Sequence, residues 1–138
     1  MINRILVAYD GSDPVKKAYD FALDLAQKYQ AEAWVVTVAR PPDFAEDVET
    51  EAILEGSRKY HHRLLAQLKQ QSAGTTLHIH FDVAVGHPGE QIIRHAEQNK
   101  VDFIVMGHRG KSFFERLRLG SVSKQVIHYA NCAVLVAR

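Results

Sequence analysis

Hydrophobic residues recur along the chain with two different periods, and their alternation predicts the secondary structure. Short, nearly continuous apolar runs cover residues 2–8, 34–38, 101–106 and 133–137, as expected for strands buried on both faces of a parallel sheet. A further run over residues 77–85 alternates apolar residues with histidines and an aspartate. Its period of two places one face in the core and the other toward water, so this strand belongs near a sheet edge.

Between these runs, apolar residues at three- and four-residue spacing predict amphipathic helices. The first helix follows residues 12–14, a serine and aspartate that could form an N-cap with a proline at a first helical position. A long helix is predicted over Val48–Gln71, although Gly56 weakens its middle by roughly 1 kcal/mol relative to alanine. Two shorter helices are expected after the turn at residues 86–89 and from near Ser121.

Five strands alternating with four helices predict one α/β domain over residues 1–138, an open five-stranded parallel sheet with helices on both faces. No internal repeat or linker divides the chain. Ligands of such sheets bind outside the carboxyl ends of the strands, where the direction of winding reverses. If the first and fourth strands are neighbours, Asp10 and residues 107–123 face one crevice.

Composition restricts the function classes. With 138 residues, 46% of them apolar, the chain can bury one core. Its 17 basic and 16 acidic residues give no reason to expect a nucleic-acid partner or an acidic membrane surface. Because the chain has no apolar run of membrane-spanning length, no signal-peptide pattern and a single cysteine, Cys132, we expect a cytoplasmic protein. Cys132 lies among apolar residues and is interpreted as buried filler.

The loop after the fourth strand has the chemistry of an anion site. Gly107 would let a ligand ring approach the backbone, and Gly110 permits a turn with positive φ. Gly120 and Ser121 stand at a helix start, where free N–H groups and the helix dipole favour an anion. Hydroxyls and charges reinforce this preference. They come from Ser121 and Ser123, and from Arg109, Lys111, Arg116 and Arg118 against the single acidic Glu115.

Two better-known phosphate motifs are excluded. The run 110–112, Gly-Lys-Ser, resembles the end of a Walker loop, but the required first glycine would fall at Val105, inside a strand. The first strand–helix turn, residues 9–13, lacks the G-x-G-x-x-G that brings a pyrophosphate onto a dinucleotide-binding helix. The remaining hypothesis is a polyphosphate site formed by a glycine-lined loop and the start of a helix.

These residues resemble the universal stress protein family. The spacing Gly107-x2-Gly110-x9-Gly120-Ser121 is similar to the pattern of the family's ATP-binding branch, G-x2-G-x9-G-[ST]. The resemblance covers the whole chain, including the opening residues 5–12, the turn at 86–88 and the closing residues 131–136.

The resemblance implies an adenine nucleotide alpha hydrolase-like fold with strand order 3-2-1-4-5. It implies ATP as ligand, with AMP or cyclic AMP as alternatives and magnesium accompanying the phosphates. It also implies a homodimer joined through the last strand, residues 133–137, which would otherwise expose an unpaired apolar edge. By resemblance, Asp10 would hold the ribose hydroxyls and Ala8, Val38 and Met106 would line the adenine slot. The ribose and first phosphates would meet Gly107, Arg109 and Gly110, and the outer phosphates Gly120, Ser121, Val122 and Ser123.

Several residues also have a purely structural interpretation. Asp10 could cap the turn before the first helix, and the glycines could serve a tight loop and a close helix–strand contact. His78 and His80 share a strand face near His61, but no acidic or cysteine partner stands at ligand spacing, so exposed polar positions explain them better than a zinc site. No nucleophile–base pair is readable, and no catalytic residue is assigned.

The leading hypothesis is therefore a regulatory ATP-binding protein of the stress response with little or no hydrolysis. One alternative is a nucleotide-independent dimeric module that presents its helices or residues 40–47 to a protein whose identity the sequence does not give. Another is a slow ATPase, with His108 or Glu115 near the outer phosphate, or a protein that phosphorylates itself at Ser121 or Ser123.

Overall fold

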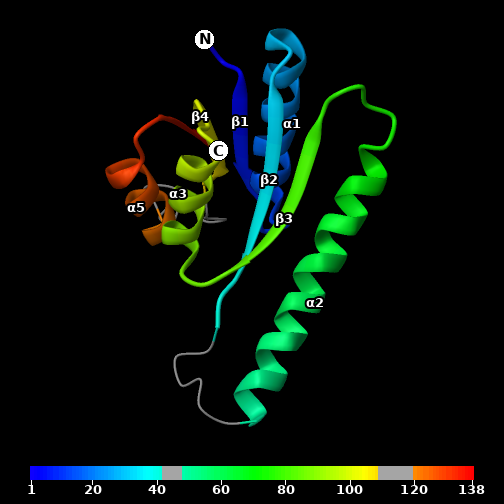
Figure 1. Cartoon of the computed structure of the whole chain (residues 1–138), viewed down its shortest axis with the longest axis vertical. Coiled ribbons are helices and arrows are strands. Elements are labelled where there is room, and N and C mark those ends of the chain that lie inside the picture. The colour runs from blue at the N-terminus through cyan, green and yellow to red at the C-terminus, as the bar shows by residue number, and fades with distance from the viewer. Residues whose placement is uncertain (42–47, 109–119) are drawn as a thin grey trace.

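The computed structural model describes residues 1–41, 48–108 and 120–138, with the side chains of residues 48–50 left out. The described residues form a single sheet and helices on both of its faces (Figure 1). In chain order the elements are β1 (Arg4–Ala8), α1 (Asp13–Tyr29), β2 (Glu32–Ala39), α2 (Val48–Gln71), β3 (Ile79–Val85), α3 (Pro88–Gln98), β4 (Phe103–Gly107), α5 (Ser121–Tyr129) and β5 (Ala133–Ala137).

The five strands are parallel and lie in the order β3-β2-β1-β4-β5, which confirms the predicted fold class and strand order. β1 pairs with β2 on one side and with β4 on the other, Val7 lying opposite Val105. The first and fourth strands are therefore neighbours, so their carboxyl ends open at the same place. β3 is an edge strand, as its alternating pattern predicted.

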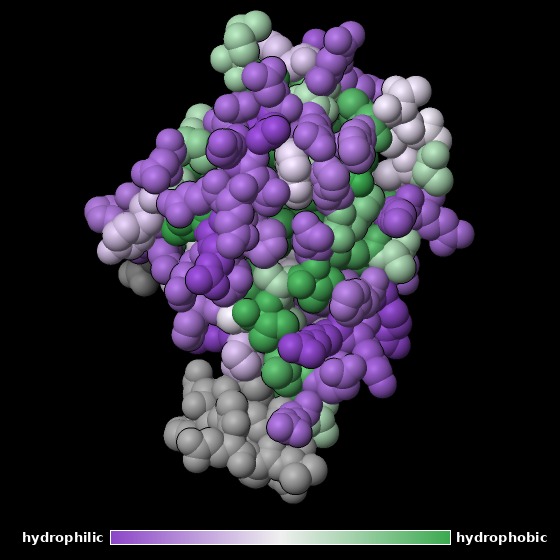
Figure 2. Space-filling view, viewed as in Figure 1, coloured by the Kyte–Doolittle hydropathy of each residue, from purple (hydrophilic) through white to green (hydrophobic). Residues whose placement is uncertain are grey.

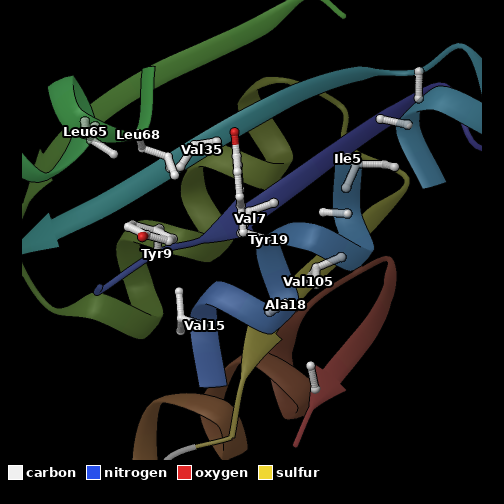
Figure 3. Packing of buried hydrophobic residues seen from close by; sticks show 14 residues of the cluster. Ile5, Val7, Tyr9, Val15, Ala18, Tyr19, Val35, Leu65, Leu68 and Val105 are labelled. Carbon is white, nitrogen blue, oxygen red and sulfur yellow. The ribbon is translucent and has the colours of Figure 1, made fainter. Parts of the chain in front are cut away.

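Two hydrophobic clusters flank the sheet because successive residues of a strand point to opposite faces. Ile5 and Val7 of β1 contact the cluster beneath α1 and α2, which Figure 3 shows with Tyr19 and Leu68. Leu6 and Ala8 belong to the cluster beneath α3 and α5. The central strand is thus buried on both faces, which explains why its sequence is a continuous apolar run rather than an alternating one.

Local details differ from the sequence expectation at two places. The backbone of Ser12 occupies the N-cap position of α1, but its side chain makes no capping hydrogen bond. The polar face of β3 is not simply exposed to water. His80 is half-buried because its ring stacks on Trp34 of β2, with centroids 4.7 Å apart and an interplanar angle of 18°. The alternating pattern therefore located the edge strand but did not reveal this contact across the face.

The buried residues of the long helix α2, among its described side chains, lie in its carboxyl half. Leu65 and Leu68 are buried, whereas Ile53 and Tyr60 are 62% and 52% exposed. In Figure 1 its lower half extends past the sheet. Figure 2 shows hydrophobic surface gathered near the centre of the same face, bordered by hydrophilic surface. None of the described helices is long and apolar enough to cross a membrane.

Candidate functional site

A cavity of about 300 Å³ opens at the carboxyl ends of β1 and β4, where parallel α/β sheets bind their ligands. This size is at the lower end for small-molecule sites, which run from about 300 to 1,000 Å³. Every sequence-predicted site residue within the described ranges lines it. These residues are Ala8, Asp10, Val38, Met106, Gly107, Gly120, Ser121, Val122 and Ser123. Arg109 and Gly110 lie outside the described residues.

Asp10 follows β1 and reaches the cavity through a tight turn. Its Oδ1 accepts a hydrogen bond from the backbone N–H of Ser12 at 2.9 Å. Aspartate commonly stabilises a turn in this way, by bonding the backbone two residues further along the chain. Gly11 continues this turn with a φ of +80°, a conformation that glycine adopts without steric cost. Asp10 therefore stabilises the turn before α1, as its structural interpretation expects. The same turn also places Asp10 in the cavity wall.

Gly107 has a packing reason to be glycine. A Cβ added there would lie 2.7 Å from Val15 Cγ2, 2.8 Å from the Val15 backbone nitrogen and 2.9 Å from the carbonyl carbon of Pro14. Two of these three atoms are backbone, so they cannot move aside cheaply. Gly107 thus lets the first turn of α1 rest against the end of β4 while its own backbone lines the cavity. Gly107 therefore serves both the close helix–strand contact and the lining of the cavity.

The amino end of α5 provides the polar wall. The backbone N–H of Lys124 donates to the Gly120 carbonyl at 3.0 Å, so the N–H groups before Lys124 precede the first intrahelical bond. The N-cap residue, Gly120, provides no side-chain cap, and the first turn of α5 has no acidic residue. By contrast, α1 and α3 carry Asp13 and Glu90 in their first turns. The end of α5 is therefore positive and open to an anion.

Six residues of the lining were not predicted from the sequence, and one of them carries a buried hydroxyl. Thr37 of β2 lines the cavity and is 1% exposed, and its hydroxyl has no hydrogen-bond partner among the described residues. Buried hydroxyls are normally paired, so this one requires an explanation. A threonine near the end of an apolar strand was a readable signal. The other missed lining residues are Tyr9, Val15, Val36, Pro88 and Ile92.

The residues considered for a catalytic or reactive role are not found among the cavity-lining residues. His108 is 3% exposed and its backbone N–H donates to the Ala137 carbonyl at 2.7 Å, yet it does not line the cavity. Glu115 lies outside the described residues. Burial, and to a lesser degree the charge of Asp102, raises the pKa of the Cys132 thiol, so the reactive thiolate is disfavoured near neutral pH. The described residues thus support no catalytic assignment.

A larger groove of about 720 Å³ lies between α1 and the carboxyl half of α2. Its lining alternates charged and apolar helix side chains such as Lys16, Asp20 and Leu64. The Tyr19 and Ser72 hydroxyls in it bond to each other at 2.6 Å, so each already has a hydrogen-bond partner within the protein. The smaller cavity combines apolar walls, a hydroxyl without a hydrogen-bond partner among the described residues, and the amino end of a helix, and it is the better candidate site.

Comparison with known proteins identifies a family and individual proteins to which this chain is similar. The model of the universal stress protein family matches residues 1–138. Universal stress protein YxiE of Bacillus subtilis (strain 168) is 33% identical over 153 aligned residues, which cover 100% of both chains.

The chain belongs to the universal stress protein family.

Solved structures of the family have the same fold. The universal stress protein UspA from Lactobacillus plantarum superposes with a TM-score of 0.87 at 26% identity, covering 99% of this chain and 97% of that one. A universal stress protein in complex with cAMP superposes with a TM-score of 0.71, also at 26% identity and covering 99% and 97%. At least one relative of similar fold therefore binds an adenine nucleotide.

Proposed function

We propose that this protein is a regulatory adenine-nucleotide-binding member of its family, with ATP as the principal ligand and AMP or cyclic AMP as alternatives. The observation that carries the proposal is the amino end of α5, where the N-cap residue Gly120 provides no side-chain cap, at one end of an apolar cavity. An anion is stabilised at such a helix end, while an apolar wall suits the flat base at the other end of the same ligand. The cAMP complex of a relative supports the choice of adenine.

Different residues of the cavity would contact the base, the ribose and the phosphates of the ligand. Ala8, Val38 and Met106 are hydrophobic and would enclose the base. Asp10 would accept hydrogen bonds from ribose hydroxyls, because carboxylate oxygens accept hydrogen bonds from hydroxyl groups. The N–H groups of Ser121, Val122 and Ser123 would donate to the outer phosphates. Arg109 and Gly110 belong to the proposal through the sequence pattern alone.

Hydrolysis is slow or incidental in this proposal. Among the described residues, His108 is buried and does not line the cavity, and the carboxylate of Asp10 is assigned to the ribose. Magnesium would be carried by the phosphates, where it supplies charge neutralisation. A homodimer through β5 completes the proposal, because β5 is an open sheet edge with half-buried valines and leucine. We place this single-domain protein in the cytoplasm, with a role in the stress response.

The test is mass spectrometry of the protein purified without added nucleotide, followed by calorimetry against ATP, AMP and cyclic AMP. We expect binding of at least one of these at millimolar concentration or below. In Gly120→Val, a β-branched side chain is introduced at the N-cap of α5, where φ is −64° and ψ is 160°. These angles suit any residue, so the fold should survive while phosphate-dependent affinity is lost.

A matched control is Gly56→Val in α2, where an added Cβ meets nothing within 4 Å. This variant should bind nucleotide as the unmodified protein does. Absence of all adenine-nucleotide binding in the unmodified protein would refute the proposal. Equal affinity in Gly120→Val would refute the assignment of the phosphates to α5.

A further inference from the structure

A second group of potential ligands lies at the amino end of the sheet, opposite the cavity. Glu32 begins β2, His78 directly precedes β3, and His80 is the second residue of β3. The register pairs Ala33 with Ile79 and Trp34 with His80, which sets the glutamate and both histidines on one face of neighbouring strands. One potential ligand atom from each of the three lies within 4.8 Å of the others.

The distances are close to those of a metal centre. His80 Nε2 lies 2.6 Å from Glu32 Oε2, and His78 Nδ1 lies 3.6 Å from the same oxygen. Tetrahedral zinc with bonds of about 2.0–2.2 Å separates neighbouring ligand atoms by roughly 3.3–3.5 Å. The His78–Glu32 pair already has this separation. The His80–Glu32 pair must open by less than about 1 Å, which rotation of a partly exposed carboxylate supplies.

Neighbouring side chains hold these ligands in place. The imidazole of His80 is stacked on the buried Trp34 ring, which restricts its plane as outer contacts do in metal centres. Arg4 Nε lies 4.0 Å from the other carboxylate oxygen of Glu32, Oε1, so Oε2 remains directed to the histidines. The Arg4 charge opposes a cation, but its Nη1 donates to the Asn99 carbonyl at 3.0 Å and its side chain is 44% exposed, so solvent screens it.

The cluster is accessible to an ion from solvent. Glu32 and His78 line an open depression of about 560 Å³ beside Gln27 and Thr76. His80 has a structural role that its stacking and hydrogen bond explain. The His78 side chain is 73% exposed and approaches the same carboxylate oxygen, and its ring centroid lies 4.5 Å from that of His80, so its imidazole is held beside the other two groups while remaining open to solvent.

We propose that Glu32, His78 and His80 bind one divalent transition-metal ion of the zinc type, with water completing the coordination. Two imidazoles and a carboxylate suit Zn²⁺, Co²⁺ or Ni²⁺ and not Mg²⁺, which prefers oxygen ligands. The sequence weighed against a metal because no acidic partner stands at ligand spacing near His78 and His80. The sheet register supplies that partner from the adjacent strand. The proposal is independent of nucleotide binding.

The experiment is calorimetric titration of untagged protein, first stripped with EDTA, with Zn²⁺ and separately with Mg²⁺. We expect one Zn²⁺ per chain with micromolar or tighter affinity and no comparable binding of Mg²⁺. Co²⁺ substitution should give visible absorption bands of low-symmetry coordination. Absence of Zn²⁺ binding at micromolar concentration would overturn the proposal.

Variants locate the ion. His78→Gln and Glu32→Gln should each weaken Zn²⁺ binding by about tenfold or more, whereas His62→Gln, at an exposed histidine of α2, should leave it unchanged. Unchanged Zn²⁺ affinity in both ligand variants would overturn the assignment. Histidine-ring NMR of the unmodified protein provides a readout that needs no variant. Zn²⁺ should shift the ring signals of His78 and His80 and leave those of His62 in place, and the reverse pattern would also overturn the assignment.

Discussion

At the residue scale, the absence of a side chain at Gly107 meets two demands. The first turn of α1 comes so close that a Cβ would lie within 3 Å of backbone atoms of Pro14 and Val15, and the same backbone lines the cavity. A glycine in a ligand-binding pattern can therefore be required by packing alone. The nucleotide interpretation of this pattern depends more on Gly120, whose φ of −64° does not require glycine.

Thr37 offers a test of the same cavity at the residue scale. Thr37→Val keeps the side-chain shape and removes a buried hydroxyl that has no partner among the described residues. The free energy of unfolding should therefore stay constant or rise, since an unsatisfied polar group costs stability. If the hydroxyl bonds the ligand, nucleotide affinity should fall about 2- to 10-fold, the value of one net hydrogen bond.

Urea denaturation and calorimetry against ATP measure the two effects of this substitution. Thr76→Val, at an exposed threonine outside the cavity, is the matched control and should change neither strongly. A loss of stability in Thr37→Val with unchanged affinity would show that the hydroxyl serves the fold.

At the element scale, the amino end of α5 distinguishes this helix from the others around the cavity. α1 and α3 carry an acidic residue in the first turn, and α5 carries none. An acidic residue there would partly neutralise the helix dipole and compete with a phosphate. This difference could be seen in the sequence because residues 120–124 contain only glycine, serine, valine and lysine.

Gly56 permits a prediction about α2. It is exposed within the helix, and a Cβ added there would meet nothing within 4 Å. Gly56→Ala should therefore raise the free energy of unfolding by about 0.4–1 kcal/mol, because alanine loses less backbone entropy on folding. Urea denaturation measures this change. The reverse substitution Ala66→Gly, at an exposed position of the same helix, should lower stability by a similar amount. A neutral Gly56→Ala beside a costly Ala66→Gly would mean that the projecting half of α2 contributes little to the folded state.

At the scale of the whole molecule, the two edges of the sheet differ. The β3 edge has polar side chains on one face and is accompanied by α2 along its length, as Figure 1 shows. The β5 edge consists only of alanine, valine and leucine. An apolar edge with unpaired backbone groups is a liability in a monomer, and a two-fold related copy would cover it.

This asymmetry predicts the effect of a charge on β5. Ala133 is exposed in the single chain, so Ala133→Asp should leave the fold intact while placing a carboxylate in the proposed interface. We expect the unmodified protein to be a dimer by light scattering after gel filtration and the variant to be monomeric. Ala73→Asp, at another exposed alanine just after α2, should remain dimeric. A monomeric unmodified protein, or a dimeric Ala133→Asp, would contradict the proposed interface.

The sequence by itself determined the order of the elements and the position of the cavity. Buried strands have continuous apolar runs, amphipathic helices have a period of 3.6, and parallel strands bring their carboxyl ends together. Asp10, Gly107 and the start of α5 could be assigned to one crevice for this reason. The order of the elements and the position of the cavity depend on local patterns that can be read from the sequence.

Only the tertiary structure decided which distant residues meet. The contact of Gly107 with α1, the burial of the Thr37 hydroxyl away from any described partner and the approach of Glu32 to His78 and His80 each depend on how separate elements pack. Glu32 lies 48 residues before His80 along the chain, and strand register alone brings them together. No local period encodes such a meeting, because it arises from the free energy of burying the whole sheet between its helices.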